Sequence, residues 1–249
     1  MAGHSKWAQI KRKKAANDQK RGKLFNKLIR EVTVAAREAG GDPEFNPRLR
    51  LAIDNAKSAN MPADNIERAI KRGTGELEGT SYEEASYEAY GPNGIALYIE
   101  ALTDNMNRTV SDLRHILDRH GGNLGQDGSV AWQFERKGQL YIDASRYDED
   151  SVMLAAVEAG AEDLRREDDV FIVTTAPSVF HDVQDGLKAQ GIEIDEGELA
   201  MVPNATVRIE GADAERFVKL LDALDDHDDV QQVYSNADID DAALAEVSS

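Results

Sequence analysis

The chain has 249 residues, no cysteine and a formal net charge of −18. The lack of cysteine excludes disulfides, thiolate nucleophiles and cysteine-based zinc sites. No apolar run approaches the roughly 18 residues that a bilayer-spanning helix needs, and the first residues match neither a secretory signal nor an organelle transit peptide, so we expect a cytoplasmic protein with no membrane partner.

The charge is unevenly distributed along the chain. Residues 1–72 hold 17 Lys or Arg and 8 Asp or Glu, whereas residues 73–249 hold 12 and 39. Such an asymmetry predicts an anionic partner for the basic part, a partner that the acidic remainder would repel. We therefore expect contact with nucleic acid to be made and steered by the N-terminal part.

The basic part is predicted to be helical. Residues 1–22 are mostly polar and are interpreted as an arm or as a helix that orders on binding. From residue 23 to residue 39, apolar residues recur at helical spacing, and Gly40 with Gly41 provides a stop.

Two further helices are expected before a linker at residues 73–81. One follows Asn46, which is a suitable N-cap, with Pro47 in the first helical position. The other precedes Gly73 and contains Asp64 and Glu67 at the spacing of a capping box. Residues 1–78 are thus predicted to form a basic N-terminal three-helix domain.

After residue 79 the apolar period shifts towards two, which is typical of strands. We expect a hairpin at 87–101, a helix at 107–120 and strands at 129–135 and 138–144. The next predicted elements are a helix at 148–160, strands at 161–167 and 169–176, a helix at 177–191 and a strand at 192–203. The last are a strand at 205–211, a helix at 213–227 and a strand at 229–237.

This order predicts an α+β protein. The middle block has the βαββαβ order of a split βαβ unit, and the elements that flank it add up to a second α+β set. We therefore expect two ferredoxin-like domains after the helical one: residues 79–135 with 201–249, and an inserted domain at 136–200.

The basic arm is the main candidate for nucleic-acid binding. Clustered cations bind phosphates and release the counterions of a polyanion, and Trp7 offers a stacking surface for an unpaired base. A solvated tail that merely aids solubility is the alternative, but a chain of large opposite charge does not need these cations. The candidate residues are His4, Ser5, Lys6, Trp7, Lys11, Arg12, Lys13, Lys14, Lys20, Arg21, Lys23, Lys27 and Arg30.

Other cations extend this candidate site. The second and third helices add a basic face made of Arg48, Arg50, Arg68, Lys71 and Arg72. Arg108 lies near the start of the helix at 107–120, where free backbone N–H groups also favour phosphate. The polar residues before that helix are equally well explained as caps, so both interpretations of this position stay open.

Other motifs indicate no enzyme. The stretch GGNLGQDGSV at 121–130 has the glycines of a phosphate cradle, but it follows a helix, precedes a strand and lacks lysine, so a turn is favoured. The histidines form no ligand cluster, because His115 and His120 are five residues apart on one helix. We expect no metal, no cofactor and no small-molecule substrate. The acidic run at 222–230 is interpreted as a solvated face or as a docking site for a basic protein.

Four segments carry more specific motifs. They are MAGHSKWAQIKRKKAANDQKRGKLFNKLIREV, NPRLRLAIDNAKSANMPADNIERAIKRG, YGPNGIALYIEALTDNMNRT and GGNLGQDGSVAWQFERKG. Together they resemble the YebC/PmpR family, which includes the mitochondrial translational activator of cytochrome oxidase. The chain departs from the family pattern at Ala89, where glycine is frequent, and at Met106, where a basic residue is usual.

The resemblance implies a helical domain followed by two α+β domains. It also implies one of two roles: a probable transcriptional regulator that binds DNA, or a ribosome-associated translation factor that relieves stalling at proline-rich stretches. The residues favour the second, because no helix-turn-helix is visible and a basic arm with a tryptophan suits irregular RNA. We expect a monomer that binds ribosomal RNA; promoter DNA is the alternative, and an acidic protein-interaction adaptor is a further one.

Overall fold

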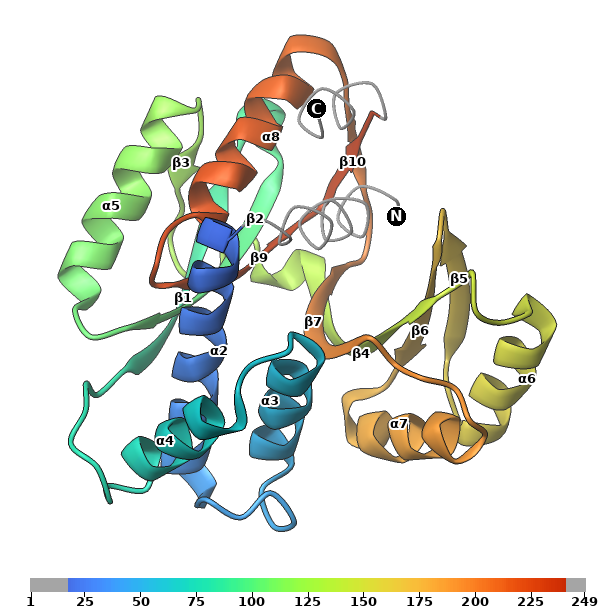
Figure 1. Cartoon of the computed structure of the whole chain (residues 1–249). Helices are drawn as coiled ribbons and strands as arrows, with labels where there is room; N and C mark the ends of the chain where they lie inside the picture. Colours follow the sequence, from blue (N-terminus) through green and yellow to red (C-terminus); the bar gives the residue numbers. More distant parts are fainter. Residues whose placement is uncertain (1–17, 241–249) are drawn as a thin grey trace. The chain divides into compact units, whose positions relative to one another are not determined.

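The structure of the protein is a computed structural model that describes residues 18–240 (Figure 1). These residues form two compact units. The first unit comprises residues 18–30, 79–135 and 202–240, and the second unit comprises residues 31–78 and 136–201. Three elements pass from one unit to the other: α2 (Asp18–Ala39), β4 (Phe134–Asp143) and β7 (Glu196–Pro203).

The first unit is built on a four-stranded sheet with the order β3-β1-β2-β9. Its strands are β1 (Glu83–Tyr90), β2 (Ala96–Thr103), β3 (Asn123–Leu124) and β9 (Val230–Ser235). β1 pairs with β2 and β2 with β9, both antiparallel, and the second pairing has a register shift between Glu100 and Ala101. A parallel pair, β8 (Val207–Ile209) and β10 (Ala237–Ile239), forms a separate small sheet.

Two helices cover one face of this sheet. They are α5 (Met106–Arg119) and α8 (Gly211–Asp225) (Figure 1). Ile99 of the sheet, Leu113 of α5 and Phe217 of α8 are fully buried in one apolar core. Burial of such side chains is the main favourable contribution to folding, so the alternation of apolar residues in β2 fixes which face the helices occupy.

The second unit contains a four-stranded sheet with the order β5-β6-β4-β7. β5 (Asp163–Glu167) and β6 (Val170–Thr175) form a hairpin, while α6 (Glu149–Ala159) and α7 (Phe180–Ala189) pack on the sheet. Chain order and strand order together are those of the split βαβ motif. The expected ferredoxin-like arrangement of this block is therefore confirmed, whereas the first sheet has a different strand order.

The second unit also contains the helical region. The latter part of α2 is buried from Val32 to Ala36, and it is followed by α3 (Pro47–Ser58) and α4 (Ala63–Gly73). A Cβ atom at Gly73 would collide with the carbonyl oxygen of Thr33 in α2, so glycine permits the two helices to approach closely. None of the helices within residues 18–240 is long and apolar enough to cross a bilayer.

The expected α+β class, with an N-terminal helical region before the sheets, is confirmed. The N-cap at Asn46 is also confirmed: its Oδ1 accepts the Leu49 N–H at 3.0 Å, and its Nδ2 donates to the Ala35 and Gly40 carbonyl oxygens at 2.8 Å each. The division into three domains stays a prediction.

Three local predictions are wrong. The expected strand at 129–135 is a 3-10 turn, Ala131–Gln133, that leads directly into β4. The short strands β3 and β10 were not expected, because two or three residues give no alternation to detect. The capping box is absent too: α4 has Pro62 at its N-cap, with no side-chain hydrogen bond.

Candidate nucleic-acid interface

Part of the candidate arm lies outside the described residues. These positions are His4, Ser5, Lys6, Trp7, Lys11, Arg12, Lys13 and Lys14. Lys20 lies in the first turn of α2. The structure describes the side chains of the remaining candidates, and they fall into two groups: cations that bind acceptors in other segments of the same unit, and cations of α4 and of the start of α2 that do not.

The first group starts with α2, whose cations meet an acidic loop. Asp225, the last residue of α8, and residues 226–229, which connect α8 to β9, are together called here the acidic loop. Lys23 Nζ lies 3.3 Å from a carboxylate oxygen of Asp226 and 3.2 Å from its carbonyl oxygen. Lys27 Nζ donates to the Asp225 carbonyl at 2.8 Å. The acidic run thus has a basic partner within its own unit.

Asp229 lies at the centre of this contact. It is 2% exposed, and its carboxylate lies 2.9 Å from Arg30 Nη1 and 2.7 Å from Arg108 Nη2. The Thr109 hydroxyl donates to it at 2.8 Å. A buried carboxylate is tolerated only when it is paired and hydrogen-bonded, and here two arginines and a threonine provide these partners.

The same contacts set the protonation of Asp229. Burial raises the pKa of the carboxyl group, but the hydrogen bonds from Arg108, Thr109 and Arg30 outweigh it and bring the pKa to about 2. Arg30 also donates to the Leu102 and Asp228 carbonyls at 3.0 and 2.7 Å, and its guanidinium lies over the Tyr82 ring. Asp229 is therefore ionised at neutral pH and joins α2 to the sheet.

Arg108 is engaged in the same cluster. Besides Asp229 it contacts Asp104 at 2.8 Å, and the two carboxylates raise its pKa. Asn105 caps α5 by accepting the Arg108 N–H at 3.1 Å, so the capping interpretation of this segment accounts for its polar residues.

Among the cations of α3, the arginines also have acceptors nearby. Arg48 pairs with Glu31 at 2.9 Å and with Glu38 at 2.6 Å. Arg50 donates to the Pro43 carbonyl at 3.2 Å. These contacts secure the loop between α2 and α3.

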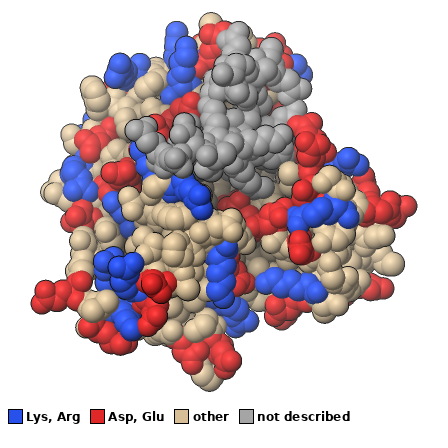
Figure 2. All heavy atoms as spheres, viewed as in Figure 1, with Lys and Arg blue, Asp and Glu red and all other residues tan. Residues whose placement is uncertain are grey.

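The second group of cations remains available. Arg68 and Arg72 are exposed on α4, and neither has an acidic partner among residues 18–240. Lys71 lies between them and pairs with Glu67 at 2.6 Å. Arg21, at the start of α2, is exposed and lies over the ring of Phe25. Residues three and four apart share a helix face, so Arg68, Lys71 and Arg72 lie together on one face of α4, which also carries Asp64 and Glu67. Figure 2 shows Lys and Arg interspersed with Asp and Glu over the visible surface.

The glycine-rich loop at 121–130 and the residue after it present backbone N–H groups that bind a carboxylate of the same chain. The side chain of Glu88, on β1, accepts backbone N–H groups from Gly128 at 2.6 Å, Val130 at 2.5 Å and Ala131 at 2.8 Å. Burial raises the pKa of Glu88, but these N–H groups outweigh the effect and lower it. The loop is thus a turn closed on an internal carboxylate, in agreement with the interpretation that it is not a phosphate site.

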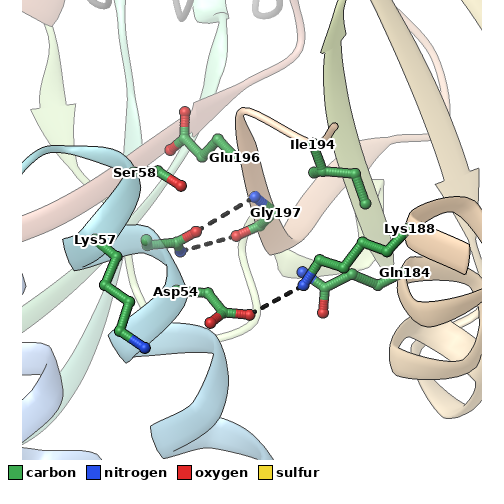
Figure 3. Close-up of a pocket in the computed structure, with 9 residues that line it drawn as sticks. Asp54, Lys57, Ser58, Gln184, Lys188, Ile194, Glu196 and Gly197 are labelled. Atoms are coloured by element: carbon green, nitrogen blue, oxygen red, sulfur yellow. Dashed lines mark hydrogen bonds and ion pairs between the residues drawn. The ribbon is translucent and has the colours of Figure 1, made fainter. Parts of the chain in front are cut away.

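A shallow polar hollow lies in the second unit (Figure 3). Asp54 of α3 pairs with Lys188 of α7 at 3.2 Å, and the Asn55 amide donates to the Gly197 carbonyl at 2.9 Å. Lys57 is exposed there. The ion pair and the hydrogen bond join α7 and β7 to α3, so the polar groups of Asp54, Lys188 and Asn55 already have partners within the unit.

The sequence did not predict the roles of two carboxylates in the first unit, Asp229 and Glu88. Asp229 and Glu88 are common surface residue types, and their neighbours come from segments far away in the chain. The acidic run at 222–230 could have indicated the role of Asp229, because closely spaced carboxylates repel one another and are stabilised by cations nearby. No side-chain cluster within residues 18–240 has the composition of a metal site.

Comparison with known proteins places these features in a family. Residues 5–76 match the model described as "TACO1/YebC protein N-terminal domain", and residues 82–237 match that of the "TACO1/YebC second and third domain". A "Probable transcriptional regulatory protein" of Halothermothrix orenii is 57% identical over 100% of this chain and 99% of the relative. One of the same name from Persephonella marina is 55% identical over 100% of both chains.

A solved structure is similar as well. The crystal structure of a conserved hypothetical protein from Aquifex aeolicus is 48% identical and superposes with a TM-score of 0.85. The similarity covers 90% of this chain and 93% of the other.

Proposed function

Because the chain belongs to the TACO1/YebC family, we propose that it is a non-enzymatic regulator of gene expression that binds nucleic acid through its N-terminal part. The relatives' names, probable transcriptional regulatory proteins, support a regulatory role. More specifically, we propose a translation factor that places its basic arm in ribosomal RNA and relieves stalling, acting as a monomer.

One observation carries the proposal: the basic residues are concentrated in residues 1–72, on a chain that is otherwise strongly acidic. Several cations of α2 and α5 are used within the first unit, by Asp225, Asp226 and Asp229. Those that stay exposed without an acidic partner, Arg68 and Arg72, join the arm in the contact set. Phosphate binding depends on cations of this kind.

Ribosomal RNA is favoured over duplex DNA by the same distribution of charge. A protein that lies along a duplex presents a broad basic face to both strands, whereas residues 73–249 hold 39 acids and 12 cations. A short basic segment with one tryptophan fits a crevice of folded RNA with unstacked bases. Binding to promoter DNA, which the relatives' names favour, is the second candidate.

The test is binding of purified ribosomes over a series of salt concentrations. We expect Lys11, Arg12, Lys13 and Lys14 replaced together by Ala to weaken binding about tenfold or more and to flatten its salt dependence, because fewer counterions are released. The matched control replaces Arg114, Arg119, Arg136 and Lys219 by Ala. It removes the same charge from exposed positions in the acidic part and should bind like the wild type.

The opposite result would refute the arm model. If both quadruple variants lose the same affinity, net charge alone determines binding. The second candidate would be right under a different result. Both quadruple variants would then bind ribosomes as tightly as the wild type does, and the wild type would bind one promoter fragment more tightly than random duplex DNA. The arm variant would lose that preference.

A further inference from the structure

The outer face of α6 in the second unit is apolar. Met153 is 39% exposed, Leu154 61% and Val157 63%, while Val152 and Ala156 on the opposite side are buried in the core. A surface helix normally presents polar residues to water. This helix is apolar on both sides, so its sequence is not explained by the packing of its own unit.

The three exposed side chains form one patch, called here the α6 patch. Val157 follows Met153 by four residues and Leu154 by three, and residues at these spacings are neighbours on a helix surface. Single exposed apolar residues need no explanation, but a contiguous group with a polar rim is typical of an interaction site.

The rim of the patch is acidic. Asp150 and Glu158 lie one turn before and one turn after Leu154, on the same side of the helix. Residues 136–201 hold 6 Lys or Arg against 16 Asp or Glu. Five of these six cations already pair with carboxylates: Lys137, Arg146, Arg165, Arg166 and Lys188. The field around the patch is therefore negative.

This charge decides which partner fits. Phosphates of nucleic acid and anionic lipid headgroups would be repelled, and a second copy of the chain would place like charges opposite each other. We infer that the α6 patch docks a segment of a basic ribosomal protein, in which an apolar anchor is flanked by Lys or Arg. The inference rests on the proposed binding to ribosomes. Residues 1–17 of the chain itself, also basic, are the competing occupant.

A charge placed in the patch tests the inference by affinity. Leu154→Glu should weaken ribosome binding about tenfold at fixed salt, because it brings a charge into an apolar contact. The matched control is Val207→Glu, which adds the same charge at a residue 41% exposed in the first unit. Leu154→Glu lies four residues from both Asp150 and Glu158, and these like-charge pairs should lower the melting temperature by about 2–4 °C at most; Val207→Glu, at an exposed position, should change it no more. Equal affinity of the two variants for ribosomes would refute the inference.

A crosslink identifies the occupant. A photoreactive phenylalanine analogue at position 154 of the full chain, bound to purified ribosomes, should crosslink to one basic ribosomal protein. Crosslinking to ribosomal RNA, to residues 1–17 or to nothing, while the protein still co-sediments, refutes the inference and leaves the proposed function standing. Failure of the wild type to co-sediment with ribosomes refutes both.

Discussion

The cations of α2 near the acidic loop and those of α4 belong to the same predicted binding surface, yet they have opposite surroundings. Arg30 is half-buried and paired with the buried Asp229, whereas Arg68 and Arg72 are exposed with no acidic partner in the described chain. We therefore expect a basic sequence to serve as a binding surface only where the fold leaves its charges without acidic partners. Arg30 is expected to act on stability, and the α4 arginines on binding.

The largest effect is expected when the buried cluster is broken. Asp229→Ala removes the buried acceptor of Thr109 and leaves Arg30, which is half-buried, without its carboxylate. Because Arg30 keeps two carbonyl acceptors, we expect a loss of about 2–3 kcal/mol, at or below the lower end for a broken buried pair. Chemical denaturation should show this loss in the free energy of unfolding. A change below about 1 kcal/mol would mean that the cluster is exposed to water in solution.

The pH dependence of stability should report the same carboxylate. The pKa of Asp229 is lowered from 3.8 to about 2 in the folded protein, so its contribution to stability is complete above about pH 5 and is lost as the pH falls through 3.8 towards 2. Asp229→Asn lacks this titration. The difference in unfolding free energy between wild type and variant should therefore narrow between about pH 5 and pH 2, and a constant difference would contradict the assignment.

The α4 arginines should show the reverse behaviour. Arg68→Ala with Arg72→Ala is expected to weaken ribosome binding several-fold, because two phosphate contacts are lost. Stability should change by less than about 0.5 kcal/mol, as for most surface substitutions. Arg114→Ala with Arg119→Ala, two exposed arginines of α5, is the control; an equal loss of binding there would remove the distinction between the regions.

The smallest effect is expected at the edge of the acidic loop. The side chains of Lys23 and Asp226 are 44% and 61% exposed, and exposed ion pairs contribute roughly 0–1 kcal/mol. Asp226→Asn should therefore barely change the melting temperature. A shift as large as that of Asp229→Ala would show that the whole loop, and not only its buried end, holds α2.

Much of the fold could be predicted because it depends on local patterns. Apolar periodicity located α5, α6, α7 and α8, and Asn46 indicated where α3 begins. The strand predicted at 129–135 failed because the N–H groups of Val130 and Ala131 bind the carboxylate of Glu88, which lies 42 and 43 positions earlier in the chain, and residues 131–133 form a 3-10 turn. Asp229 could not be placed for a similar reason: its partners, Arg30 and Arg108, come together only in the folded unit.

The central claim is that the basic N-terminal part contacts ribosomal RNA. The most direct measurement is ultraviolet crosslinking in cells, with the wild type and the variant in which Lys11, Arg12, Lys13 and Lys14 are Ala, followed by sequencing of the bound nucleic acid. We predict that the wild-type crosslinks concentrate at a few positions in ribosomal RNA and disappear in the variant. Crosslinks at discrete promoter DNA, with ribosomal RNA at background, would contradict the claim.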